Sequence, residues 1–563
     1  MDDISRYPRP QMVRKEYMLL DGEWKLDGRK IIVPFCPQSS ASKYDGPVGD
    51  KLVYERNFEI PKEWGNQRIL LHFGAVDEVC KVYVNGTFAG SHEGGYLPFY
   101  FDITEMIRRG DGNLIRVEAT DTLSHLYPYG KQRKDRGGMW YTPVSGLYKS
   151  VWMEPVPDEY IESLRIDTTL DEAKIIIKTS QRNGIVDAVA GTVTLLDEGG
   201  NETLNDQSYE ISEGEAVIHI DEPRNWSDTD PYLYRFRVEC GRDSVESYFA
   251  LRTIEILPDK EGIPRLCLNK RPVFLHGLLD QGYFQEGIYT PKDPGEFAAE
   301  IKRIKALGFN CLRKHIKVEP ETFYYECDRL GMLVVQDMVN NGPYHYLRDT
   351  VMPTIGFKKK KERPAFTEKE KRRRKIFEEH MTGTIEHLYD HPSIVMYTIF
   401  NEGWGQFESD RLYEAARKLD PTRVYDSTSG WYAHEKSDVE SEHIYFRNER
   451  LATHGRPVFL SECGGYSYPV EGHLFNTKKS YGYGDKLHSR RDLTEKIKLM
   501  YDEMVIPSIK DGLCGCIYTQ VSDVEDEING LFTYDRKVCK VVEAEMKSIA
   551  SDIGSEIDKI RMY

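Results

Sequence analysis

The 563-residue chain contains no apolar run of the roughly 18 residues that a membrane-spanning helix needs, and its first twenty residues lack the apolar core of a signal peptide. We therefore expect a soluble, cytoplasmic protein with no membrane partner. Positive charge is also in deficit, because 76 Lys and Arg against 92 Asp and Glu give a net charge of −16. An acidic chain is poorly suited to binding nucleic-acid phosphates. The basic segment 357–375 is the remaining candidate for such binding, but its interspersed glutamates are typical of a solvated surface.

Paired cysteine spacings are absent as well. The ten cysteines are scattered, without the pattern of a zinc site or the density of a disulfide scaffold, so we expect them to be reduced and mostly buried. The sequence has no clear metal-ligand cluster and no internal repeat. We predict no metal and no cofactor.

The first half of the chain consists of short alternating apolar segments. Between residues 20 and 155 these segments, such as "RILLHFGAV" and "NLIRVEATD", are separated by Gly, Pro, Asn and Asp, which is typical of a β-sandwich. A further run of strand-like segments follows up to about residue 258, with the length of an immunoglobulin-like sandwich. We predict an N-terminal β-sandwich of jelly-roll type over residues 1–156 and an immunoglobulin-like β-sandwich over residues 157–257.

After residue 258 the pattern changes to apolar strands that alternate with amphipathic helical segments. "PVFLHGLL", "FNCLRKH", "MLVVQD", "SIVMYTIFNE", "VYDSTS", "EHIYF", "PVFLSE" and "GLCGCIYTQ" are eight such strands in about 300 residues. Strands buried on both faces and joined by helices form parallel sheets, and eight of them close into a barrel. We predict a (β/α)8 TIM barrel over residues 258–563, with its site at the carboxyl ends of the strands.

Two glutamates come directly after apolar strand patterns in this region. Glu402 follows "IVMYTIFN" and Glu462 follows "RPVFLS", so both would lie on the rim of the barrel. Hydrolysis of an acetal requires a proton for the departing oxygen and a nucleophile or base at the anomeric carbon, which two carboxylates can supply. Asn401 precedes Glu402 and could hydrogen-bond a sugar hydroxyl. A glutamate that only neutralises a neighbouring base is the alternative.

Two tryptophans close to these motifs are candidate walls of a sugar site. Trp404 lies two residues after Glu402, and Trp431 follows the strand "VYDSTS". The apolar face of a sugar stacks on an aromatic ring. Ordinary packing in the core is the alternative for each.

The sequence resembles the family 2 glycoside hydrolases, the group of β-galactosidases, β-glucuronidases and β-mannosidases. The segments that carry the resemblance are "LLDGEWKL", "GGMWYTPVSGLYKSVWMEPV", "NKRPVFLHGLLDQGYF", "GFNCLRKH" and "IFNEGWGQF", and together they extend over nearly the whole chain. The resemblance implies that Glu402 is the general acid/base, that Glu462 is the nucleophile, and that Asn401 holds the 2-hydroxyl.

The same resemblance suggests supporting residues. Arg313 matches an arginine beneath the nucleophile, where it would keep the carboxylate ionised. His315 matches a histidine of the site, although Lys314 replaces the small residue that usually precedes it, and a packed position behind the site is the alternative. Asp280 is expected to bind sugar hydroxyls and Tyr445 to contact the ring, with His443 as a weaker candidate beside it.

We hypothesise a retaining exo-β-glycosidase that acts on a small-molecule glycoside or oligosaccharide, with neutral β-galactosides as its first substrates. The Asn-x-Lys pair with which β-glucuronidases of the family bind a carboxylate is replaced by Glu527 and Asn529 after the eighth strand. Asn476 and Lys478 occur in the right order, but after the seventh strand. A β-glucuronidase, a β-mannosidase, a furanosidase and a non-catalytic carbohydrate-binding protein on the same scaffold are the alternatives. Homo-oligomer formation is left open.

Overall fold

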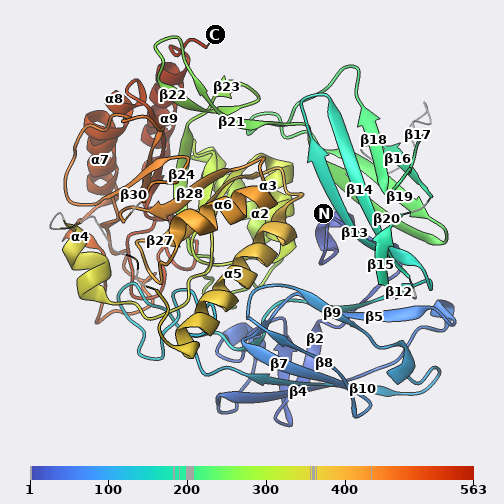
Figure 1. Cartoon of the computed structure of the whole chain (residues 1–563). Helices are drawn as coiled ribbons and strands as arrows, with labels where there is room; N and C mark the ends of the chain where they lie inside the picture. The colour runs from blue at the N-terminus through green and yellow to red at the C-terminus, as the bar shows by residue number, and fades with distance from the viewer. Residues whose placement is uncertain are drawn as a thin grey trace.

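The computed structural model of the chain describes residues 3–562 except 182–183, 189, 198–207, 355–356, 358–361, 363 and 433. Part of the basic segment 357–375 therefore lies outside the described residues. The described chain forms two β-sandwiches and a parallel barrel, which Figure 1 places side by side. The predicted fold class is confirmed. No helix in the described ranges is both long enough and apolar enough to cross a membrane.

The first sandwich consists of two antiparallel sheets that enclose a hydrophobic core. One sheet has the order β1 (Met18–Leu19), β12 (Val151–Val156), β5 (Arg68–Phe73) and β9 (Phe99–Asp102). The other has the order β3 (Arg29–Val33), β2 (Gly22–Leu26), β4 (Lys51–Phe58), β10 (Asn113–Thr120), β7 (Val79–Val84) and β8 (Thr87–Glu93). Buried residues alternate with more accessible ones along β10, as expected for a strand with one face on the core.

The second sandwich has the immunoglobulin-like arrangement of two antiparallel sheets. The first contains β13 (Tyr160–Thr168), β14 (Glu172–Gln181), β15 (Gly184–Asp187) and β18 (Glu215–His219). The second contains β17 (Ser208–Glu210), β16 (Thr192–Leu196), β19 (Tyr234–Cys240) and β20 (Asp243–Phe249). The N-terminal segment, with α1 (Asp3–Arg6), belongs to this region in space, because Val13 pairs with Glu246 of β20 and Met12 lies in the core of this sandwich. The predicted domain boundaries remain predictions.

A small antiparallel sheet leads into the barrel. It consists of β21 (Ile254–Pro258), β22 (Pro264–Leu268) and β23 (Arg271–Pro272). Leu266 and Leu268 pack in one cluster with apolar side chains from inside the barrel strands, such as Leu275 and Val335. The sheet therefore covers the barrel interior at one end and leaves the other end for the rim residues.

Eight parallel strands form the barrel. Their order is β28 (Val424–Ser429), β27 (Ile394–Asn401), β26 (Leu333–Asp337), β25 (Cys311–Lys314), β24 (Leu275–Asp280), β33 (Leu513–Tyr518), β30 (Val458–Cys463) and β29 (Glu440–Ile444). The two ends of this order meet, because the Asp438 N–H beside β29 donates to the Tyr425 carbonyl of β28 over 2.9 Å. Two short strands, β31 (Tyr466–Ser467) and β32 (Tyr483–Lys486), pair in the loop after β30.

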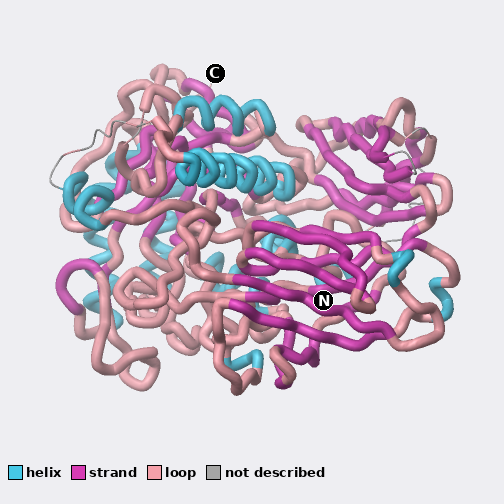
Figure 2. The backbone as a smooth tube through the Cα atoms, turned by 60° about the horizontal axis from the view of Figure 1, so that its bottom comes forward, coloured by secondary structure: helices cyan, strands magenta, loops and turns pink. Residues whose placement is uncertain are grey.

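Helices cover the outside of the barrel, as Figure 2 shows in cyan. They are α2 (Glu296–Ala306), α3 (Glu321–Leu330), α4 (Met352–Thr354), α5 (Glu368–Leu388), α6 (Ser409–Leu419), α7 (Arg490–Met500), α8 (Ile506–Ile509) and α9 (Glu543–Ile557). The longest, α5, begins where the Thr367 side chain accepts a hydrogen bond from the Glu370 N–H. Among the described residues, the connections from β28 to β29 and from β29 to β30 contain no helix, so the predicted alternation is incomplete there.

Candidate active site

The barrel brings Glu402 and Glu462 together at the carboxyl ends of two strands. Glu402 is the first residue after β27, and its backbone has a positive φ of 53°, which is uncommon for a residue with a side chain. Its N–H donates to the Ser429 carbonyl of β28 over 3.1 Å, which fixes this turn. Glu462 is the fifth residue of β30 and is 5% exposed. The strand ends therefore position both carboxylates on rigid backbone.

His443 of β29 lies between the two carboxylates. Its Nδ1 is 2.9 Å from Glu402 Oε1 and 3.6 Å from Glu462 Oε2. On the other side of the ring, His443 Nε2 lies 3.4 Å from Arg313 Nη1. One carboxylate oxygen of each glutamate and one ring nitrogen of His443 all lie within 4.8 Å of one another. The carboxylates are therefore close to the separation of about 5 to 5.5 Å at which one of them can attack a sugar directly.

Arg313 connects the residues beneath the pair. Its side chain is fully buried and its guanidinium donates to Glu462 Oε1 over 3.1 Å, to Asp337 Oδ1 over 3.0 Å and to Asn401 Oδ1 over 2.9 Å. Asn401 Oδ1 also accepts from Ser429 Oγ. With Oδ1 held by two donors, the Nδ2 group of Asn401 is turned away from the arginine, and no acceptor for it lies among the described residues.

The surroundings of Glu462 stabilise its ionised form. Burial alone would raise the pKa of the carboxyl, but His443, Arg313 and His315, together with a hydrogen bond from Tyr445, lower the pKa to about 2. An ionised carboxylate is the state that a nucleophile requires.

The Tyr445 hydroxyl donates directly to Glu462 Oε2 and lies 3.3 Å from Thr519 Oγ1. Its ring is stacked on Tyr483 of β32 with centroids 4.2 Å apart and planes 17° from parallel. Tyr483, which no sequence pattern indicated, thus holds the ring of Tyr445 against the nucleophile candidate.

Replacing Tyr445 with Phe tests this contact. We expect kcat to fall by about 10- to 100-fold, because a hydrogen bond to a charged group is lost. The same change should raise the pKa of Glu462, so kcat/KM should begin to fall at a higher pH on the acid side than in the wild type. A pH–rate profile measures both. Tyr413→Phe is the control, since the Tyr413 hydroxyl also donates to a carboxylate, Asp438, but outside the site; equal profiles for the two variants would contradict the assignment.

His315 and Asp280 lie deeper than the carboxylate pair. His315 Nδ1 is 2.8 Å from Asp337 Oδ2, and burial lowers the pKa of His315 to about 4. Asp280 ends β24, accepts from Lys314 Nζ over 2.5 Å and from the Gly282 N–H over 2.9 Å, and is 3% exposed. The lysine that replaces the expected small residue therefore has a buried acidic partner. Sugar binding by His315 and Asp280 remains a prediction.

The two tryptophans occupy different places. Trp431 meets His443 edge to face with centroids 5.3 Å apart, so it lies beside the carboxylate pair. Trp404 is 1% exposed, donates to the Gly342 carbonyl and meets the Trp140 ring of the first sandwich edge to face. Trp404 thus belongs to an aromatic cluster that joins two domains, and stacking of either tryptophan on a sugar remains a prediction.

A loop of the first sandwich, residues 129–142, is attached to the rim of the barrel. The Tyr129 hydroxyl donates to the Gly342 carbonyl, Arg136 Nη1 lies 3.2 Å from Glu525 Oε2, and the Tyr141 hydroxyl donates to Glu527. The sequence did not indicate where this loop lies. It makes the first sandwich a wall of the candidate site.

Lys131 of this loop is a cation that lies close enough to the polar residues above the barrel to influence their pKa values. Burial lowers the pKa of His315 and the Lys131 charge adds to that lowering, whereas the same charge opposes the rise that burial gives to the pKa of Glu527. Its Nζ is 5.8 Å from the Trp140 ring centroid. Within the described ranges, no carboxylate lies in ion-pair contact with Lys131.

The acidic segment after β33 and the Asn-x-Lys pair are in contact. Asn476 Nδ2 donates to Asp526 Oδ1 over 3.0 Å, whereas the side chain of Lys478 is exposed. Glu527 is buried and accepts from Asn529 Nδ2 over 3.0 Å. In the part of the chain that the structure describes, the group able to share a metal ion is Glu402, His443 and Glu462, the carboxylate pair itself.

Comparison with known families matches three models to consecutive parts of this chain. The sugar binding domain of the glycosyl hydrolases family 2 matches residues 38–157, the glycosyl hydrolases family 2 model matches residues 159–252, and the TIM barrel domain of that family matches residues 264–455. The chain belongs to glycosyl hydrolase family 2. The resemblance predicted from the sequence is thereby confirmed. The barrel match ends before Glu462, so the assignment of the nucleophile rests on geometry.

The relatives of this family 2 chain include proteins named β-galactosidase and proteins named β-glucuronidase. A β-galactosidase of Thermoanaerobacter pseudethanolicus is 25% identical over 456 residues, which cover 74% of this chain and 54% of the relative. A β-glucuronidase of Bacteroides fragilis is 24% identical, over 74% of this chain and 61% of the relative. The chain spans about half the length of the curated β-galactosidases it matches.

Solved structures match the whole fold. A β-D-glucuronidase of Dictyoglomus thermophilum has a TM-score of 0.75 at 18% identity, with 99% of both chains covered. A β-glucuronidase of Lactobacillus rhamnosus has a TM-score of 0.73 at 18% identity, with 97% of both chains covered. At this identity the likeness establishes the three-domain fold of family 2.

Proposed function

We propose that this family 2 chain is a retaining exo-β-glycosidase. The observation that carries the proposal is the position of Glu402 and Glu462 on either side of His443. One carboxylate oxygen of each glutamate and one ring nitrogen of His443 lie within 4.8 Å of one another. Two carboxylates this close leave no room for a water molecule between the nucleophile and the sugar, which favours direct attack.

The roles follow from the contacts. Glu462, ionised and held by Arg313 and Tyr445, attacks the anomeric carbon, while Glu402 protonates the glycosidic oxygen as the bond breaks. Glu402 then takes a proton from the water that releases the sugar from Glu462. Asn401, whose Oδ1 is held by Arg313 and Ser429, binds the hydroxyl next to the reacting carbon through Nδ2.

Stereochemistry tests the mechanism. We expect the first-formed sugar to have the β configuration of the substrate, as observed by proton NMR within the first turnovers and before mutarotation. An α product would require a water molecule in the place assigned to Glu462 and would exclude this mechanism.

We propose neutral β-galactosides as the first substrates. The buried Glu527 and the acidic residues Glu525 and Asp526 lie on the loop after β33 that contacts the wall from the first sandwich, and their charges would repel a uronate. A panel of p-nitrophenyl β-glycosides tests which sugar is preferred. The panel contains the galactoside, the glucuronide, the mannoside and furanosides, and the substrates are compared by kcat/KM.

β-Glucuronides are the second candidate, and the position of Lys131 favours them. Its ammonium has no carboxylate partner in the described residues and acts on both His315 and Glu527, so it could pair with the carboxylate of a uronate. The β-glucuronidases among the relatives are consistent with this candidate.

Lys131→Gln separates the two substrates. If the chain hydrolyses β-glucuronides, we expect kcat/KM for the p-nitrophenyl glucuronide to fall by about tenfold or more, with little change for the galactoside, because only the uronate loses an ionic partner. Lys134→Gln is the matched control on the same loop, since Lys134 is exposed and paired with Asp50. Equal losses of kcat/KM on both substrates would show that Lys131 does not bind the carboxylate of the uronate.

A further inference from the structure

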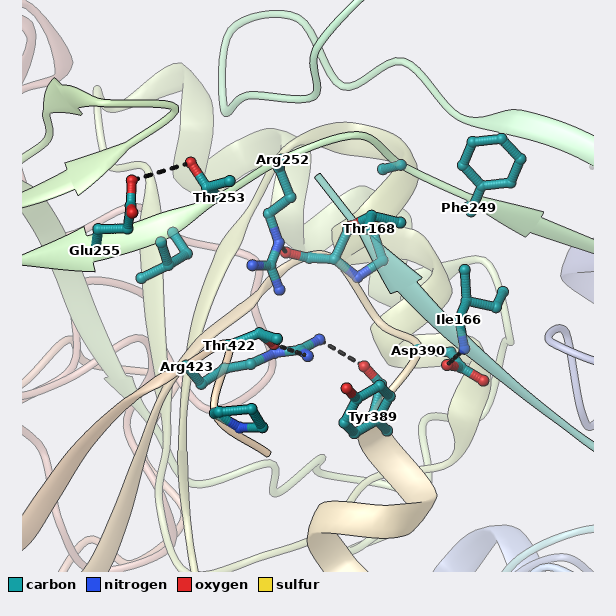
Figure 3. Close-up of a pocket in the computed structure, with 14 residues that line it drawn as sticks. Ile166, Thr168, Phe249, Arg252, Thr253, Glu255, Tyr389, Asp390, Thr422 and Arg423 are labelled. Carbon is teal, nitrogen blue, oxygen red and sulfur yellow. Dashed lines mark hydrogen bonds between the residues drawn. The ribbon is translucent and has the colours of Figure 1, made fainter. Parts of the chain in front are cut away.

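A cavity lies between the immunoglobulin-like sandwich and the barrel, away from the carboxylate pair. It has a volume of about 220 Å³ and is lined by β13, by the segment from β20 to β21 and by the residues that precede β27 and β28. The catalytic candidates lie at the opposite, carboxyl ends of those barrel strands. Figure 3 shows the lining residues, with two arginines, Arg252 and Arg423, reaching in from the two domains.

The two guanidinium groups lie side by side. Arg252 Nη2 and Arg423 Nε both donate to the Ile394 carbonyl, over 3.1 and 3.2 Å. Both side chains are more than nine-tenths buried, with exposures of 5% and 6%. Two like charges that share one acceptor in a buried place repel each other unless an anion compensates them.

The partners of the two arginines differ. Arg423 forms an ion pair with Asp420 over 3.0 Å. Arg252 donates only to carbonyls, from Nε to Pro392 and from Nη2 to Ile394; among the described residues it has no carboxylate in ion-pair contact, and its Nη1 has no hydrogen-bond partner. Burial, followed by the charge of Arg423, lowers the pKa of Arg252 to about 9. A buried cation with a free N–H donor thus faces a cavity.

The cavity lining also contains threonines and carboxylates. Thr168, Thr253 and Thr422 line the cavity; the Thr253 hydroxyl donates to Glu255 and the Thr422 hydroxyl donates to Asp420 over 2.7 Å, so Thr168 is the lining threonine whose hydroxyl has no acceptor among the described residues. The carboxylates there are Glu255, which accepts from the Thr253 hydroxyl over 3.5 Å, and Asp390, which accepts from the Ile166 N–H over 2.7 Å. Burial raises the pKa of Asp390 to about 7, so its charge opposes an anion only in part at neutral pH.

We propose that this cavity binds a small oxyanion, either inorganic phosphate or the phosphate group of a small metabolite, between Arg252 and Arg423. Arg252 donates to the phosphate oxygens from Nη1, and the Thr168 hydroxyl adds a second donor. A ligand held there contacts both the sandwich and the barrel and therefore stabilises their junction.

Calorimetric titration and thermal unfolding of the full chain test the proposal. With inorganic phosphate or glycerol phosphate as probe, and chloride at equal ionic strength as control, we expect saturable binding and a rise in unfolding temperature that levels off with concentration. Tighter binding of the ester than of inorganic phosphate would indicate a metabolite, and equal or weaker binding of the ester would indicate free phosphate.

Two variants should change phosphate affinity in opposite directions. Arg252→Met should weaken binding by about tenfold or more, because the free donor and the uncompensated charge are lost. Asp390→Asn retains the acceptor for the Ile166 N–H and removes a carboxylate, so at pH 7.5 it should tighten binding about three- to tenfold. Arg242→Met, at an exposed turn of the same sandwich, should leave affinity unchanged. If Arg252→Met does not fold, the affinity of Asp390→Asn for phosphate is sufficient to test the proposal. The proposal would be overturned if the wild type showed no saturable phosphate binding, or if Asp390→Asn bound phosphate no more tightly than the wild type.

Discussion

Glu462→Ala is expected to lower turnover of every β-glycoside substrate by about 10⁴-fold or more, while the sugar still binds. The variant removes the carboxylate that Arg313, Tyr445 and His443 contact and that attacks the anomeric carbon in the proposed mechanism. Steady-state kinetics on an activated aryl glycoside measure the loss, and titration with the free sugar measures binding.

The control for this variant is Glu471→Ala, an exposed glutamate on the loop after β31, together with a thermal unfolding curve to show that Glu462→Ala is folded. A non-catalytic carbohydrate-binding protein on the same scaffold makes the opposite prediction, since the wild type would bind sugar without turnover and Glu462→Ala would remove no activity. Turnover by the wild type that survives in Glu462→Ala would exclude Glu462 as the nucleophile.

Glu402→Ala should show a loss that depends on the leaving group. For glycosides with a poorly activated leaving group we expect a fall of about 10²- to 10⁴-fold, since the departing oxygen receives no proton. For a dinitrophenyl glycoside, whose leaving group needs no proton, formation of the glycosyl-enzyme should be nearly unaffected and its hydrolysis should become slow. A burst of dinitrophenol followed by a slow phase is the expected result in stopped flow.

Addition of azide to Glu402→Ala is the second part of that experiment. A small anion that needs no general base can replace water in the space left by Glu402, so azide should accelerate the slow phase and yield a β-glycosyl azide. Equal losses for both leaving groups and no effect of azide would show that Glu402 acts only through the position of His443, whose Nδ1 lies 2.9 Å away.

The barrel could be predicted because its strands are buried on both faces and leave nearly continuous apolar runs such as residues 394–400. The same runs located the two glutamates, since a charged residue at the end of such a strand lies on the rim. Asp337, which binds both Arg313 and His315, ends β26 in the same way and could have been found by that signal.

Other parts of the site have no local signal. Lys131 lies on a loop and Tyr483 on the short strand β32, and their places follow from contacts between segments far apart in the chain, such as that between Tyr141 and Glu527. The pairing of Asp280 with Lys314 likewise depends on two neighbouring barrel strands. Periodicity reports which face of an element is buried, but not which loop lies against it.

Covalent trapping tests most directly whether residues 402 and 462 act on one sugar. A 2-deoxy-2-fluoro β-glycoside with a dinitrophenyl leaving group slows release of the sugar, so the protein should gain one fluorosugar, as measured by intact mass. After digestion, the added mass should be found on the peptide that contains Glu462. An unreactive competitor should protect the wild type from labelling. Attachment at another residue, or no attachment while the dinitrophenyl glycoside is still turned over, would contradict the assignment.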